Sequence, residues 1–258
     1  MLIVLPPSET KRPPPDEGPP VDLGSLSFPS LTPMRRRILE ALVATSAEPD
    51  AFRRLMVGPS LADEVVRNTW LREQPTRPAL EVYTGPLYQA LDAATLLPAA
   101  RRRADRQLVV ISSLWGALRP ADRIPAYRLH VCSRLVGMDR LEPTWRTVLP
   151  AALREAAGSR GPIVELRSPS YQAVGMPQGL EDRTVVVRVV RDDDGSGRVP
   201  NDPAKRTRGQ LARDLLEAGT DPVTPEELAS VLGDRWPVEL IAPSRPGETW
   251  TATVAIRA

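Results

Sequence analysis

Residues 107–120, QLVVISSLWGALRP, join a short run of apolar and β-branched side chains to a loop that begins with two serines. A buried strand is typically this short and this rich in valine and isoleucine, with turn residues at its end. The stretch therefore predicts a strand over Gln107–Ser112. Six further runs of the same character predict strands over Leu2–Leu5, Ala79–Tyr83, Pro162–Arg167, Thr184–Arg191, Pro237–Ala242 and Thr249–Ile256.

Helical patterns lie between most of these runs. Apolar residues at helical spacing around Ile38 and Leu42 predict one helix. Ser60 and Asp63 resemble a capping box at the start of a second helix. Thr224, followed by a proline and then a glutamate three positions on, indicates the start of another.

Two turn-like segments complete the pattern. SRPG at residues 244–247 separates the last two predicted strands as a hairpin turn would. DDDGSG at residues 192–197 also predicts a hairpin turn, because it lacks the spaced ligands and closing glutamate of an EF-hand loop. Strands that alternate with helices and end in an antiparallel pair predict the α/β class, with a mixed β-sheet flanked by helices.

The chain of 258 residues is long enough to bury a sizeable core, and we expect a single compact domain over residues 1–258. Residues 12–33 are rich in proline and show no periodicity, which predicts a long loop or lid. No apolar run approaches the roughly 18 residues of a membrane span, and the first apolar run is too short for a signal peptide. We therefore expect a cytoplasmic protein without a membrane partner, whose oligomeric state is open.

The composition removes several reaction classes. The single cysteine, Cys132, excludes an intrachain disulfide, and the single histidine, His130, excludes the usual zinc sites, so we expect no metal and no cofactor. A net charge of +2 is only mildly basic, so any basic patch must be local. Among 34 lysines and arginines, lysine occurs only at Lys11 and Lys205, and burial can lower the pKa of a lysine in a way that arginine does not match.

Three of the predicted strands end in polar loops. These loops are PPSETK after residue 5, SSLWGALRP after residue 111 and SPSY after residue 167. Ligands of open α/β sheets bind beyond the carboxyl ends of the strands. The loops, together with the second lysine, supply the candidate catalytic residues Ser8, Glu9, Lys11, Ser112, Ser113, Ser168 and Lys205. The sequence has no G-x-S-x-G elbow, Walker loop or dinucleotide fingerprint, whereas a serine–lysine pairing stays open. The alternative is that the serines only cap helices.

Residues 201–216, NDPAKRTRGQLARDLL, predict an amphipathic helix whose first residues, ahead of a proline, fit a capped start. At about 100° per residue, Arg206 and Arg213 fall on the solvent side, whereas Lys205 and Arg208 fall on the apolar face. Cations on a buried face need an anionic partner, either a carboxylate or a phosphate. Gly209 would let another backbone or a ligand approach closely.

Several blocks of the chain resemble the YaaA family of peroxide stress proteins, of the UPF0246 type and an actinobacterial-like branch. They occur in the family's order and are LPPSETK, YTGPLYQALDA, ISSLWGALRPADRIPAYRL, IVELRSPSYQAV and AKRTRGQLARDLL. Two positions depart from the usual pattern. Glu9 stands where other branches have lysine, and His130 stands where many members have glutamate, so a role of that acid does not transfer.

The resemblance implies a single-domain α/β "cannoli"-type fold with a positively charged cleft and a helix-hairpin-helix-like element. It also implies DNA binding, and a role in peroxide stress that keeps unincorporated iron low. Direct iron binding would have to use carboxylates, because cysteine and histidine are scarce. Candidates are Glu9, Asp92, Asp122 and Glu165, although we expect an indirect effect on iron.

Two main functional hypotheses follow. In the first, the protein binds the phosphate backbone of double-stranded or distorted DNA with weak sequence preference. Its phosphate contacts would be Lys11, Arg119, Arg128, Lys205, Arg208 and Gly209, with Trp115, Tyr127 and Tyr171 as stacking candidates. In the second, it is an enzyme that acts on a phosphorylated, nucleotide-like or nucleoside-like small ligand, in a pocket formed by PPSETK, SSLWG, SPSY and AKRTRG. A third alternative is an adaptor that binds another protein.

Overall fold

A mixed sheet runs through the centre of the computed structural model, which describes residues 1–191 and 199–256. Within these residues, seven strands follow the order β4-β3-β1-β6-β7-β9-β8. The central pairs β3–β1, β1–β6, β6–β7 and β7–β9 are parallel, and the outer pairs β4–β3 and β9–β8 are antiparallel. The bounds are β1 (Leu2–Leu5), β3 (Leu108–Ser112), β4 (Gly116–Leu118), β6 (Ile163–Glu165), β7 (Thr184–Arg191), β8 (Val238–Ile241) and β9 (Trp250–Ile256).

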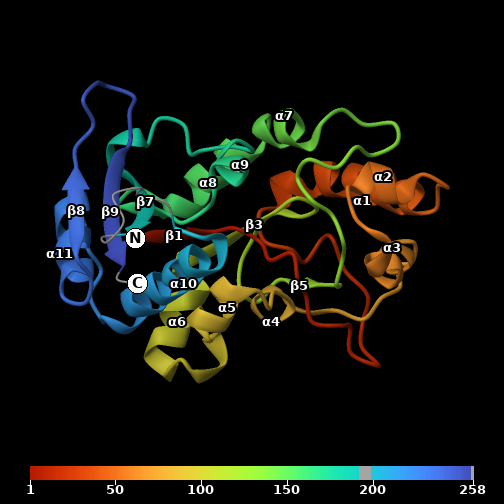
Figure 1. Ribbon diagram of the computed structural model, residues 1–258, viewed down its shortest axis with the longest axis horizontal. Helices are drawn as coiled ribbons and strands as arrows, with labels where there is room; N and C mark the ends of the chain where they lie inside the picture. The colour runs from red at the N-terminus through yellow and green to blue at the C-terminus, as the bar shows by residue number, and fades with distance from the viewer. Residues whose placement is uncertain (192–198, 257–258) are drawn as a thin grey trace.

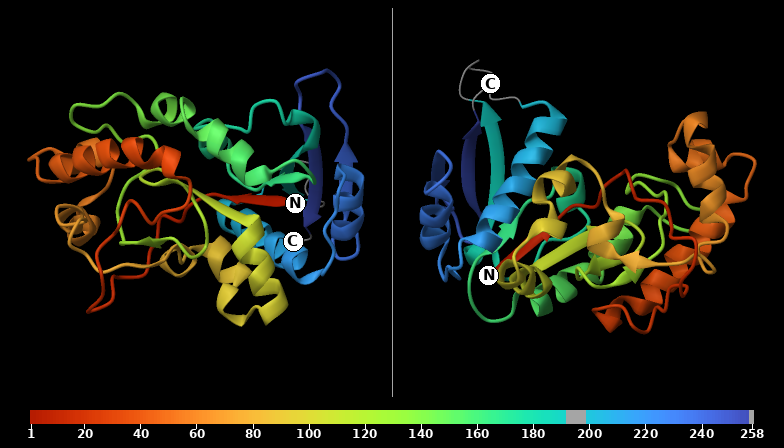
Figure 2. Two further views of the ribbon diagram at one scale, coloured as in Figure 1. Left: turned by 180° about the vertical axis from the view of Figure 1, so that it is seen from behind. Right: turned by 90° about the horizontal axis from the view of Figure 1, so that it is seen from below.

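Helices cover both faces of this sheet, which confirms the predicted α/β class (Figure 1). The helices are α1 (Thr32–Ser46), α2 (Ala51–Leu55), α3 (Ala62–Asn68), α4 (Ala79–Val82), α5 (Pro86–Leu91), α6 (Pro98–Gln107), α7 (Leu141–Arg146), α8 (Leu149–Ala157), α9 (Pro169–Gln172), α10 (Asn201–Glu217) and α11 (Pro225–Gly233). Helices α5, α6 and α10 lie together on one side of β1, and α8 and α9 lie on the other, as both directions of view show (Figures 1 and 2). The helix-hairpin-helix-like element stays a prediction.

The centre of the sheet carries the core. All residues of β1, β3 and β6 are buried, because these strands are flanked by neighbours on both edges and by helices on both faces. A parallel register sets Ile3 opposite Leu108 on one side and opposite Val164 on the other. The carboxyl ends of β1, β3 and β6 therefore meet at one edge of the sheet.

The predicted strand at Ala79–Tyr83 is wrong. The segment forms the single turn α4, and Tyr83 follows it in extended conformation as an isolated bridge partner of Lys11. Alanine, leucine and glutamate favour helix, and this propensity outweighs the short apolar pattern. The two-residue strand β2 (Arg77–Pro78) immediately precedes α4 and pairs with β5 (Arg123–Ile124) in a separate small sheet.

One of the two predicted helix starts is correct. Thr224 Oγ1 accepts a hydrogen bond from the Glu227 amide at 3.2 Å, as a capping residue does. Ser60 does not cap α3, because it lies within the 3-10 helix η2 (Pro59–Leu61) and α3 begins only afterwards. The turn at residues 244–247 joins the antiparallel strands β8 and β9, as predicted. The predicted turn at residues 192–197 lies outside the described residues.

The proline-rich segment over residues 12–33 runs without helix or strand as far as Phe28, and then enters η1 (Pro29–Leu31) and α1. Its end is fixed by Arg35, which is fully buried and donates hydrogen bonds to the carbonyls of Ser27 and Phe28 and of Trp115 and Ala117. The loop is thus anchored on β4, and its role as a lid stays a prediction. In the described residues, no helix combines the length and apolar character that a membrane span requires.

Candidate functional site

A pocket of about 530 Å³ opens beyond the carboxyl ends of β1 and β6. Four segments line it, namely residues of the 6–10 loop after β1, the start of α5 at residues 85–88, the turn around α9, and the first two turns of α10. His130, in the loop after β5, completes the wall. Two of the three polar loops that the sequence analysis singled out therefore meet here, together with the predicted cationic helix.

Helix α10 brings the cations Lys205 and Arg208 to this pocket, as its helical phase indicates. The Lys205 side chain is 44% exposed and its Nζ lies 3.8 Å from Asp202, so it stands at the rim. Asn201 and Asp202 do not cap the helix. Helix α10 already begins at Asn201, after Pro200 at the cap position, and Pro203 lies within its first turn, where a missing N–H is tolerated.

Arg208 is the cation with the least compensation in this pocket. It makes no hydrogen bond or ion pair to any other described residue, and its Nε is buried without a partner. Burial lowers the pKa of the Arg208 guanidinium, and the nearby Glu165 carboxylate partly offsets this effect. A buried guanidinium donor without an acceptor is costly, so this position favours an anion in the pocket.

Glu165 does not compensate Arg208 fully, because it is already paired. Glu165 Oε1 accepts from the Arg167 amide at 2.9 Å and from its Nε at 2.8 Å, and Oε2 accepts from Nη2 at 2.6 Å. Both side chains are fully buried. The charge of Arg208, beside this neutral pair, is therefore not balanced by Glu165. Glu165 is thus part of the frame of the site and is not free for iron.

The neighbouring residues of α10 have structural roles. Gly209 is buried against the backbone of Leu87 and does not line the pocket, so the close approach that it permits is to α5 rather than to a ligand. Arg206 is exposed, as predicted. The prediction for Arg213 is wrong, because its side chain is only 18% exposed and donates to the carbonyls of Leu91 and Asp92 at the end of α5.

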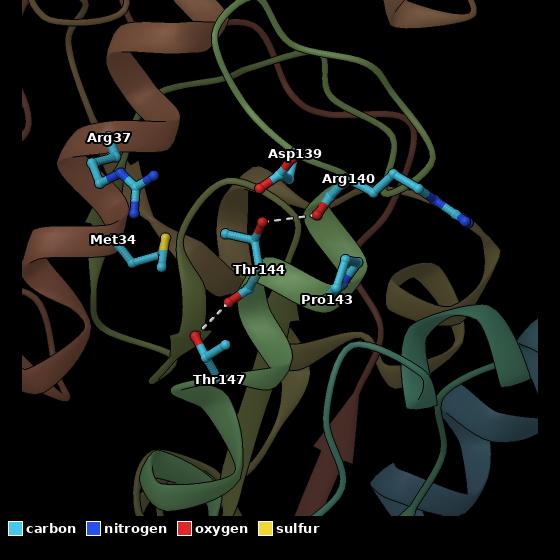
Figure 3. A pocket seen from close by; sticks show the side chains of 7 residues that line it. All are labelled: Met34, Arg37, Asp139, Arg140, Pro143, Thr144 and Thr147. Atoms are coloured by element: carbon cyan, nitrogen blue, oxygen red, sulfur yellow. Dashed lines mark hydrogen bonds between the residues drawn. The ribbon is translucent and has the colours of Figure 1, made fainter.

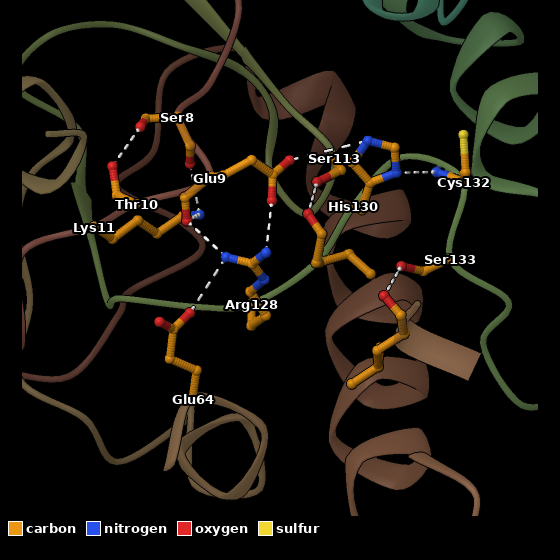
Figure 4. Close-up of polar contacts among 12 residues, drawn as sticks. Ser8, Glu9, Thr10, Lys11, Glu64, Ser113, Arg128, His130, Cys132 and Ser133 are labelled. Carbon is orange, nitrogen blue, oxygen red and sulfur yellow. Dashed lines mark hydrogen bonds and ion pairs between the residues drawn. The ribbon is translucent and has the colours of Figure 1, made fainter. Parts of the chain in front are cut away.

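A network of charged side chains joins Glu9, which lines the pocket, to Arg128 and Glu64 (Figure 4). Arg128 Nη2 lies 3.2 Å from Glu9 Oε2, and its Nη1 lies 3.5 Å from Glu64 Oε2. The two carboxylates offset the charge of Arg128 and of Lys11 next to it. The phosphate role predicted for Arg128 and Lys11 thus has less support from the geometry than that of Arg208.

Lys11 lies beneath the 6–10 loop, outside the lining of the pocket. Its Nζ donates to the Ser8 carbonyl at 2.8 Å and sits 4.3 Å from the centre of the Tyr127 ring. Burial lowers the pKa of Lys11 to about 8, with Glu9 opposing the shift. Because its partner is the carbonyl of Ser8, Lys11 is not placed as a base for the Ser8 hydroxyl, which instead accepts from the Gly85 amide at 2.8 Å.

The candidate serines divide into two groups. Ser8, Ser168 and the neighbouring Ser170 line the pocket. Ser112 and Ser113 are buried, with Ser112 Oγ bonded to the Tyr127 hydroxyl at 2.7 Å and Ser113 Oγ donating to the Leu129 carbonyl at 2.7 Å. Their hydroxyls hold the loop after β3 in place, so the third polar loop supports the site without facing it.

The stacking candidates divide in the same way. Trp115 and Tyr127 are buried in the core, whereas Tyr171 forms part of the pocket wall. Tyr88, which the sequence analysis did not single out, also lines the pocket, and its hydroxyl donates to the Pro6 carbonyl at 2.6 Å. The only signal for it was its place in the YTGPLYQALDA block, because an isolated tyrosine at helical spacing normally indicates core.

Arg119 lies at the other end of β3. It donates to the carbonyls of Arg106 and Leu108, at the start of that strand, and does not line the pocket. Asp122 accepts from the Arg119 amide and from Ser27, and Asp92 accepts from Thr95, so both are used locally. The described residues contain no group of three histidine, cysteine or acidic side chains that could hold a metal.

A second pocket of about 580 Å³ lies between α1 and α7 (Figure 3). Met34 and Arg37 of α1 face Thr144 and Thr147 of the α7 region across it. Both threonine hydroxyls donate to backbone carbonyls of their own segment, at 2.8 Å each. The pocket is thus lined by satisfied side chains and exposed arginine, and it has no buried unpaired group comparable to Arg208.

Comparison with known proteins agrees with the resemblance seen in the motifs. The sequence profile of the family described as "Peroxide stress protein YaaA" matches residues 1–239. A UPF0246 protein of Streptomyces coelicolor is 42% identical over 260 residues, which cover 99% of this chain and 98% of that protein. UPF0246 proteins of Corynebacterium efficiens and Corynebacterium glutamicum are 42% and 37% identical over 235 residues, covering 90% of this chain and 91% of each relative. The chain therefore belongs to the YaaA family of peroxide stress proteins.

Proposed function

We propose that this protein acts in the cytoplasmic response to peroxide stress by binding a phosphorylated ligand of nucleotide size in the pocket at the start of α10. The observation that carries the proposal is Arg208, a partly buried cation that lines the pocket and has an unpartnered Nε. A guanidinium can bind a phosphate or phosphate ester through two parallel hydrogen bonds.

The shape of the pocket favours a small ligand over a nucleic-acid strand. Its volume of about 530 Å³ lies within the range of small-molecule sites. Its lining combines hydroxyls, tyrosines and charges of both signs, whereas a groove for a phosphate backbone is expected to be lined mainly by cations. Three further cations were proposed as phosphate contacts besides Lys205 and Arg208. Lys11 and Arg119 do not line the pocket, and Arg128 is paired with carboxylates.

Binding of DNA through its phosphates is the second candidate. It is favoured by the exposed cations of α10, because Lys205 stands at the rim of the pocket and Arg206 is exposed beside it. A phosphate of distorted DNA would then enter the pocket at Arg208 while the strand crosses α10. Such binding would weaken steeply with salt, and gel shifts of duplex, bubble and single-stranded DNA at rising salt concentration test it.

Isothermal titration calorimetry with ribose 5-phosphate and the four ribonucleoside 5′-monophosphates tests the main proposal. We expect binding by the wild-type protein and a loss of about tenfold or more in Arg208→Gln, because a charge-assisted contact is removed. Arg206→Gln removes the same charge from the same helix outside the pocket and should bind like wild type. Absence of binding at millimolar ligand, or equal losses in both variants, would overturn the proposal. Mass spectrometry of the incubated ligand shows whether it is also converted.

A further inference from the structure

Glu9 and His130 line the same pocket as Arg208 and face each other (Figure 4). Glu9 Oε1 and His130 Nε2 are 4.0 Å apart, which is too far for a hydrogen bond. The Glu9 and His130 side chains are 45% and 36% exposed, so both are accessible to a ligand. The other oxygen of Glu9 is held by Arg128 at 3.2 Å, which fixes the direction of the carboxylate.

The backbone determines which nitrogen of His130 carries the proton. The Cys132 amide donates a hydrogen bond to His130 Nδ1 at 3.1 Å. Nδ1 is therefore an acceptor, and the proton of the neutral imidazole lies on Nε2. The pocket thus presents an acceptor, Glu9 Oε1, beside a donor, the Nε2–H of His130.

This arrangement does not suit general-base catalysis by His130. A histidine that acts as a general base keeps one nitrogen unprotonated toward the substrate while a second group orients the other nitrogen. Here the unprotonated Nδ1 is already occupied by the backbone, and the nitrogen that faces the pocket carries the proton. The pair is arranged for recognition, because among the described residues neither Glu9 Oε1 nor His130 Nε2 has a hydrogen-bond partner.

We propose that Glu9 and His130 recognise the hydrogen-bonding edge of a nucleobase whose phosphate is held at Arg208. An adjacent N–H and acceptor on a planar heterocycle would bind Glu9 Oε1 and the His130 Nε2–H, respectively. Tyr88 and Tyr171, which line the same pocket, supply aromatic surface for the ring. This inference rests on the proposed function and assigns its ligand to the class of nucleoside monophosphates.

Calorimetry on wild type, His130→Leu and His130→Gln tests the inference, with thermal melting to establish that each variant is folded. The probes are ribose 5-phosphate, the four ribonucleoside 5′-monophosphates and the four nucleosides. We expect at least one nucleotide to bind about tenfold or more tightly than ribose 5-phosphate. His130→Leu should remove that advantage and leave the affinity for ribose 5-phosphate unchanged. His130→Gln, which keeps an N–H donor, should retain part of it.

The outcomes separate the two proposals. Nucleotides that bind no more tightly than ribose 5-phosphate, or a His130→Leu variant that weakens both equally, would overturn base recognition and leave phosphate binding intact. Nucleosides that bind in a His130-dependent manner, without any gain from the phosphate, would support base recognition and overturn the proposed function. If no probe binds, both proposals are wrong.

Discussion

Gly209 of α10 packs directly on the backbone carbonyl of Leu87 in α5. A Cβ at position 209 would lie 2.0 Å from the Leu87 oxygen and 3.0 Å from the Cβ of Ala90. Real side chains do not approach a carbonyl oxygen so closely. The contact thus fixes the distance between α10 and α5, and with it the place of Arg208 at the pocket.

Gly209→Ala should therefore destabilise the protein. Alanine favours helix over glycine by up to about 1 kcal/mol, but forced overpacking costs about 1–3 kcal/mol and more against a backbone that cannot move aside. We expect a net loss of roughly 2 kcal/mol in urea unfolding. Gly233→Ala, at the end of α11 with no heavy atom within 4 Å of the added Cβ, is the matched control and should be neutral or stabilising. Equal behaviour of the two variants would contradict the packing explanation.

The buried pair of Glu165 and Arg167 gives a second prediction. Glu165→Gln leaves Arg167 buried without its anion and increases the positive charge beside Arg208. Removing one partner of a buried ion pair typically costs about 3–5 kcal/mol, so chemical denaturation should show a loss of that order. Asp105→Asn breaks the exposed pair with Arg101, at 3.3 Å, and should cost less than about 1 kcal/mol. A loss for Glu165→Gln no larger than for this control would show that the pair is not needed for folding.

Much of the sheet and the orientation of α10 could be predicted from the sequence, because they depend on local patterns. The runs around β1, β3, β6, β7 and β9 are apolar and β-branched, and these properties place them in the centre of a sheet. Helical phase was enough to direct Lys205 and Arg208 to the pocket, since the phase of a regular helix is set by its own residues.

The rest depends on contacts between distant residues, which no local pattern reports. Arg128 is neutralised by Glu64, on a helix far away in the sequence, so its charge is not available as the cation count suggests. Ser112 and Ser113 bond to Tyr127 and Leu129, which follow β5 further along the chain. Helical phase also failed for Arg213. It lies on the side of α10 away from the apolar face, as predicted, but that side packs against the end of α5 rather than facing solvent.

Arg213 supplies a third prediction. Its Nη1 donates to the carbonyls of Leu91 and Asp92 and to Thr95 Oγ1 at 2.9–3.0 Å, and it satisfies the carboxyl end of α5. Lysine keeps the charge but cannot reproduce the planar fork of donors, so Arg213→Lys should lose roughly 1–3 kcal/mol of unfolding free energy. Arg206 is exposed, and among the described residues its side chain makes one long contact, of 3.4 Å to Gln89, so Arg206→Lys should change stability by less than about 0.5 kcal/mol. Two variants of equal stability would argue against this role.

Lys11 makes the stability of the protein depend on pH in the alkaline range. Burial lowers the pKa of Lys11 in the folded protein from 10.5 to about 8, whereas the unfolded chain keeps the ordinary value. The unfolded state therefore binds the proton more tightly, and a protonated Lys11 reduces stability below pH about 8. As the pH rises from about 8 to about 10.5, this penalty disappears, so the contribution of Lys11 to the unfolding free energy should increase across that window.

Urea unfolding of wild type and Lys11→Met at a series of pH values measures this contribution, because other titrating groups cancel in the difference. The wild-type curve should rise relative to the variant between these limits and become parallel to it above them, whereas curves that are parallel throughout would show that Lys11 keeps its ordinary pKa.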